Sequence, residues 1–82
     1  MTQTPTSYAS LVATEIRAEM ARQRKTQVGL AKLLGVSDGT ANNRFSGAYP
    51  YDLDELKAVA CWLDTSVANL SEAAERNWRA AS

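Results

Sequence analysis

Apolar residues recur at helical spacing through most of the chain. In the first segment they stand three or four positions apart, which is the spacing of one face of an α-helix. The members of this stripe are Tyr8, Leu11, Val12, Ile16 and Met20. Just before it, Ser7 has the side-chain oxygen that commonly caps a helix N-terminus. The pattern predicts an amphipathic helix over residues 7–24, with basic residues in the last turn, where cations favour the helix dipole.

Two shorter segments follow, each with a cap at its start and a glycine at its end. Thr26 and Gly35 bracket a second helix, and Ser37 and Gly47 bracket a third. The apolar side expected for the second helix consists of Val28, Leu30, Ala31 and Leu34. Gly29 inside this helix is unfavourable by ~1 kcal/mol relative to alanine. It therefore predicts either the close approach of a neighbour or tolerance through tertiary packing.

Two more helices complete the pattern. After a loop at residues 48–51, Asp52 caps a fourth helix, and Thr65 or Ser66 opens a fifth. Their apolar stripes are Leu53, Leu56, Val59, Ala60 and Leu63, and then Val67, Leu70, Ala73 and Ala74. A chain of 82 residues hides only about 60 % of its unfolded surface on folding. We therefore expect one small all-α domain with a compact core.

The third helix differs from the others because it is mostly polar. Two apolar residues four positions apart, Ala41 and Phe45, are enough to anchor it. The side chains then expected to face outward are Asp38, Gly39, Thr40, Asn42, Asn43 and Arg44. Two short helices joined by a tight glycine-containing turn, the second of them polar, are typical of a helix-turn-helix.

The same residues resemble a known family. "TQVGLAKLLGVSDGTANNRFSG", followed by "DLDELKAVACWLDTSVANL", is similar to the Cro/C1-type (XRE-like) helix-turn-helix proteins of phage and bacterial repressors. The matching features are Thr-Gln, Leu-Ala, Leu-Gly-Val-Ser, a following Thr, Ser-Gly, and the Leu-x-x-Leu and Ala-x-x-Leu pairs of the fourth helix. The resemblance implies a compact five-helix, lambda-repressor-like domain over residues 7–72, before a C-terminal helix extension or tail at residues 73–82. Residues 1–6 are polar and include Pro5, so we expect them to be a disordered leader.

The resemblance also implies that the third helix enters the major groove of double-stranded DNA. Its side chains suit that groove, because Asn pairs with adenine, Arg with guanine, and Thr or Asp with thymine or cytosine. The base-reading candidates are Asp38, Gly39, Thr40, Asn42, Asn43 and Arg44. The expected function is sequence-specific transcriptional regulation, as a phage or prophage repressor of the Cro or immunity type that occupies an operator.

Phosphate contacts are expected from a second group of residues. Gln27 matches a family position that contacts phosphate, at a helix N-terminus whose free N–H groups suit an anion. The other candidates are Arg24, Lys25, Lys32 and Ser46. Two plainer interpretations stay open: Arg22, Arg24 and Lys25 as an ordinary solvated helix end, and Asp38 as a first-turn acid that repels phosphate.

The charge distribution supports a polyanionic partner despite a net charge of zero. Residues 1–47 carry six basic and three acidic side chains, whereas residues 48–82 carry three basic and six acidic ones. Such asymmetry is a recognised sign of nucleic-acid contact. The basic half contains the predicted helix-turn-helix.

Other function classes find little support. With one cysteine, Cys61, and no histidine, the chain offers neither a disulfide framework nor a Cys/His metal cluster, and Cys61 is expected to act as a small hydrophobe. Nor does any nucleophile stand beside a base, so we expect no enzyme, cofactor, metal or small-molecule ligand. No apolar run approaches the ~20 residues of a membrane span, and no export signal is seen. We therefore expect a protein of the bacterial host cytoplasm, associated with the nucleoid.

The two tryptophans leave alternatives open. Trp62 and Trp78 pack onto the first helix or each other, or else form a subunit interface. A homodimer is expected because such proteins usually bind paired half-sites, and it forms either in solution or only on DNA. Two further functions remain: an antitoxin or accessory module that binds another protein, and a weakly specific architectural DNA binder, which Gly39 favours because it has no side chain for readout.

Overall fold

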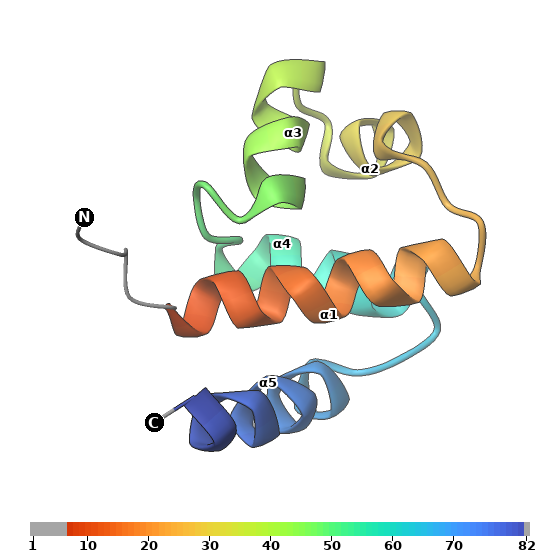
Figure 1. Cartoon of the computed structure of the whole chain (residues 1–82). Helices are drawn as coiled ribbons and strands as arrows, with labels where there is room; N and C mark the ends of the chain where they lie inside the picture. Colours follow the sequence, from red (N-terminus) through yellow and green to blue (C-terminus); the bar gives the residue numbers. More distant parts are fainter. Residues whose placement is uncertain (1–6, 82) are drawn as a thin grey trace, which may run out of the picture.

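The computed structural model of the protein describes residues 7–81, and these form five α-helices without a strand (Figure 1). The helices are α1 (Tyr8–Arg22), α2 (Gln27–Leu34), α3 (Asp38–Ser46), α4 (Leu53–Trp62) and α5 (Val67–Ala81). The predicted all-α fold is confirmed. The leader expected at residues 1–6 lies outside the described residues, as does Ser82.

The predicted caps set the ends of the helices. The side chains of Ser7, Thr26 and Ser37 each accept a hydrogen bond from the backbone N–H three residues later. Asp52 and Glu55 form a reciprocal capping box at the start of α4. At the other ends, α2 and α3 stop at glycines with left-handed backbones, φ +66° and +86°, a conformation that favours glycine.

The core lies where α1, α4 and α5 meet, with α2 and α3 packed on one side of α1 and α5 on the other (Figure 1). Ile16, Val59 and Leu63 lie at its centre and are almost wholly buried. Its remaining members are Val12, Met20, Leu30, Leu56, Ala60, Leu70 and Ala74. From α3 only Ala41 is fully buried, and Phe45 packs against the core in part, so α3 is held by few apolar contacts.

Several expectations about individual positions are wrong. Val28 is 56 % exposed, because at 100° per residue it lies 200° from Leu30, on the opposite face of α2. Leu53 is 82 % exposed, since as the first residue of α4 it borders an open groove beyond the core. Cys61 is exposed as well. Helix α1 ends at Arg22, so Arg24 belongs to the connection that follows it.

Candidate nucleic-acid interface

The helix-turn-helix pair α2–α3 forms one end of the molecule, with α1 between it and α5 (Figure 1). On α3, Asp38, Gly39 and Asn42 are exposed, and Thr40 and Asn43 are half-buried. The hydroxyl of Ser37 donates to that of Thr40 over 3.1 Å. The side chains predicted to read bases are thus brought together on α3, although their contact with bases stays a prediction.

Arg44 does not face outward as expected. Its Nε donates to Oε1 of Glu55 at 2.9 Å, and the two side chains are only 22 % and 15 % exposed. The same carboxylate oxygen accepts the backbone N–H of Asp52. Arg44 is therefore held through its Nε by the cap of α4, and this ion pair restricts where its guanidinium can reach.

Arg17 of α1 is a further residue of the site that the sequence did not reveal. Its Nη1 donates to the carbonyl oxygen of Phe45 at 2.6 Å, and its Nη2 to Oγ1 of Thr14 at 3.1 Å. The guanidinium also lies 5.9 Å from the centroid of the Phe45 ring. This side chain thereby satisfies a carbonyl in the last turn of α3 and ties that helix to α1. In the sequence, Arg17 looks like an ordinary polar residue beside Ile16.

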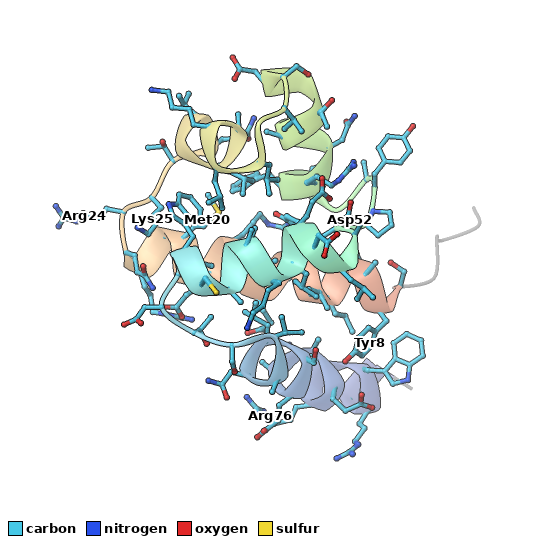
Figure 2. The ribbon with its side chains drawn as sticks, turned by 180° about the vertical axis from the view of Figure 1, so that it is seen from behind. Tyr8, Met20, Arg24, Lys25, Asp52 and Arg76 are labelled. Carbon is cyan, nitrogen blue, oxygen red and sulfur yellow. The ribbon has the colours of Figure 1, made fainter. Side chains whose placement is uncertain are left out.

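The predicted phosphate contacts occupy different environments. Arg24, Lys32 and Ser46 are exposed, and Gln27 and Lys25 are half-buried. Arg24 extends away from the ribbon (Figure 2) and has a positive φ of 56°. Lys25, by contrast, has its Nζ 4.9 Å from the centroid of the Trp62 ring. None of the five is buried, so each side chain has a route to an approaching anion.

The tryptophans both make contacts within the chain. Trp62 is half-buried and packs against the core, and Trp78 meets Tyr8 of α1 edge-on with ring centroids 5.9 Å apart. Trp78 remains 41 % exposed. The interpretation of packing onto the first helix therefore holds for Trp78, whereas a subunit interface at Trp62 or Trp78 stays a prediction.

Two polar groups near the helix ends have altered acidity. Burial raises the pKa of the Tyr51 phenol to about 12, and its hydroxyl finds no hydrogen-bond partner among the described residues. Hydrogen bonds from Arg22 and then from Gln23 lower the pKa of the Glu19 carboxyl. The Gln23 amide also donates to the carbonyl of Leu63 at 2.6 Å, which joins the end of α1 to the end of α4.

A family model described as the BetR domain matches residues 7–78, nearly the whole of the described chain. The chain belongs to the BetR domain family. No curated protein and no solved structure matches it. Membership of the BetR domain family is consistent with a small regulatory, DNA-binding-like domain of helix-turn-helix type. Over residues 7–81, none of the helices of this BetR domain combines the length and the apolar character needed to cross a membrane.

Proposed function

We propose that this BetR domain is a sequence-specific double-stranded DNA-binding transcriptional regulator. The proposal depends on how α3 is exposed. This helix buries Ala41 completely and leaves a run of small polar side chains accessible at its N-terminal end. A major groove admits one such helix, and amide and hydroxyl side chains at its leading end match base edges. Of the regulators with this fold, a phage or prophage repressor of the Cro or immunity type fits best.

Gly39 supports the approach of a partner surface to α3, whether the binding is specific or only weakly so. Its backbone does not have a positive φ, and a Cβ added there would meet only the Ser37 Oγ, at 4.0 Å. Neither backbone strain nor packing within the chain thus accounts for a glycine in the first turn of α3, although glycine is a poorer helix former than alanine. The close approach of a partner surface at the start of α3 accounts for it.

Affinity in this account comes mainly from phosphates and specificity from bases. Arg24, Lys25 and Lys32 supply positive charge around the start and end of α2, and the N-terminal N–H groups of α2 suit an anion. Repression follows if the bound domain excludes polymerase or a rival regulator from the operator. The proposal includes no catalysis and no cofactor, places the protein with the nucleoid in the bacterial cytoplasm, and includes pairing of two copies on adjacent half-sites.

The test compares duplex DNA from upstream of the protein's own gene with a scrambled duplex of the same length and base composition. At physiological salt, the proposal expects at least tenfold tighter binding to the upstream duplex. Equal binding to both duplexes would leave only the weakly specific architectural role. A complete lack of binding even at low salt would rule out both roles.

One observation favours a second candidate, an antitoxin or accessory module that binds another protein. Apolar side chains line an open groove between α1, α4 and α5, with Leu53 at its edge. Its lining residues are Tyr8, Ala9, Val12, Pro50, Tyr51, Leu53, Leu56, Val67 and Ser71. Co-purification of a neighbouring gene's product, lost with Leu53→Asp and retained with Asn43→Ala, would favour this candidate over DNA binding.

A further inference from the structure

Lys25 lies on the face of an aromatic ring from a distant helix. Its ammonium nitrogen is 4.9 Å from the ring centroid of Trp62, the last residue of α4. A cation over an indole at this distance is attracted by the electron-rich ring face. Lys25 is half-buried, whereas its neighbour Arg24 is exposed and extends away from the ribbon (Figure 2). Of these two adjacent cations, only Lys25 contacts a ring.

The ring occupies a space that depends on a glycine. A Cβ added at Gly29 would lie 3.3 Å from Cζ2 of Trp62 and 3.4 Å from Oγ1 of Thr26. A side chain at position 29 would therefore press on the indole. This close approach accounts for Gly29 inside a helix, and it fixes the indole against the start of α2.

The backbone on both sides of the contact is also held. The N–H of Lys25 donates to the carbonyl of Met20 at 2.9 Å, which closes the end of α1. One residue beyond Trp62, the carbonyl of Leu63 accepts the Gln23 side chain at 2.6 Å. The indole and the lysine therefore meet between two anchored chain segments.

We propose that Trp62 is a positioning residue that holds the Lys25 ammonium beside the N-terminus of α2, ready for a phosphate of duplex DNA. This inference rests on the proposed function. A free lysine loses much rotamer freedom when it binds an anion, and the ring reduces that loss because it already confines the side chain. The ring face leaves N–H donors of the ammonium free for the phosphate, which the N-terminal N–H groups of α2 also attract.

A double-mutant cycle tests the dependence of one residue on the other, with the duplex from upstream of the gene as the probe. In the native background, Trp62→Leu weakens binding about two- to fivefold, the range of an accessible cation–ring contact. In a Lys25→Met background the same change has no further effect. Trp62→Phe, which keeps a ring face, restores most of the affinity. Lys32→Met is the matched control: it removes a cation that touches no ring, and its effect adds to that of Trp62→Leu.

Fluorescence supplies a readout that needs no change at Trp62. Because the chain has two tryptophans, Trp78→Phe leaves Trp62 as the sole indole. Lys25→Met then shifts the emission of the free protein, whereas Lys32→Met does not. Adding the upstream duplex changes the Trp62 emission of the Trp78→Phe protein that keeps Lys25. This change is smaller when Lys25→Met is added, but not when Lys32→Met is added.

The outcomes separate this inference from the function on which it rests. If no duplex binds even at low salt, the proposed function fails and this role of Trp62 fails with it. If DNA binds but the effects of Trp62→Leu and Lys25→Met simply add, only the positioning role is overturned. An unchanged Trp62 emission in Lys25→Met also overturns it, and that measurement does not depend on the stability of any Trp62 variant.

Discussion

Nη1 of Arg17 in α1 lies 2.6 Å from the carbonyl oxygen of Phe45 in the last turn of α3. Through this bond α1, which contributes Val12, Ile16 and Met20 to the core, fixes the C-terminal end of the polar helix α3. We expect Arg17→Met to lower the free energy of unfolding by about 1 to 3 kcal/mol, because a hydrogen bond from a charged donor is lost and the carbonyl loses its partner. Urea denaturation measures this change.

Arg22→Met, which removes an exposed i,i+3 pair with Glu19, is the control and should lower the free energy of unfolding by less than about 0.5 kcal/mol. Equal effects of the two changes would contradict the role assigned to Arg17.

The ion pair of Arg44 with Glu55 predicts a structural role for Arg44. Since both side chains are mostly covered, we expect Arg44→Met to cost about 1 to 2 kcal/mol of stability, between the values for exposed and buried pairs. The double variant Arg44→Met, Glu55→Gln should cost less than the sum of the single changes. On DNA, Arg44→Met should alter base preference less than Asn43→Ala does. A large loss of preference at one guanine would show instead that Arg44 reads a base.

Helix positions and caps could be predicted from the sequence, because they depend on residues close together in the chain. Ser7, Thr26, Ser37 and Asp52 cap helices as expected. The predicted apolar stripes fail at Val28 and Leu53, where side-chain type alone does not tell which face or which end of a helix a neighbour covers.

Contacts between distant residues could not be predicted in the same way. Arg17 and Phe45 are 28 positions apart, and Lys25 meets a ring of α4, so neither contact has a local spacing that would reveal it. Arg44 looked accessible because a single helix shows nothing of the carboxylate that α4 brings to it. The polar character of α3 can be predicted from the sequence, whereas the residues that hold α3 in place cannot.

Tyr51 predicts how stability depends on pH. Its phenol has a pKa of about 12 in the fold, above the value near 10 of an unfolded chain. The folded state therefore holds the phenolic proton more tightly, and this contribution to stability is complete below pH 10 and is lost as the pH rises from 10 to 12. Because the hydroxyl also lacks a partner among the described residues, Tyr51→Phe should leave stability at pH 7 unchanged or slightly higher. Absorbance titration should show one of the three tyrosines ionising later than the others, and this late step should disappear in Tyr51→Phe.

Gly39 predicts changes of opposite sign in stability and binding. Since a Cβ there meets only the Ser37 Oγ, at 4.0 Å, Gly39→Ala should raise the free energy of unfolding by about 0.4 to 1 kcal/mol, because alanine has fewer conformations to lose from the unfolded chain. If DNA approaches this position closely, the same change weakens binding to the upstream duplex. Thermal unfolding and a binding titration of one variant measure both effects. Stabilisation without any loss of affinity would remove Gly39 as support for the interface.

If α3 reads base edges while α2 and its flanking cations contact phosphates, substitutions in the two groups should differ in how they depend on DNA sequence and on salt. The affinities of Asn43→Ala and Lys25→Ala are measured against the native protein, on the upstream duplex and on its scrambled counterpart, over a series of salt concentrations. We predict that Asn43→Ala weakens binding to the upstream duplex by about 1 to 3 kcal/mol and leaves binding to the scrambled duplex unchanged. Lys25→Ala should weaken binding to both duplexes alike. It should also reduce the slope of log affinity against log salt concentration by about 1. Equal effects of the two changes on both duplexes would contradict this assignment of base and phosphate contacts.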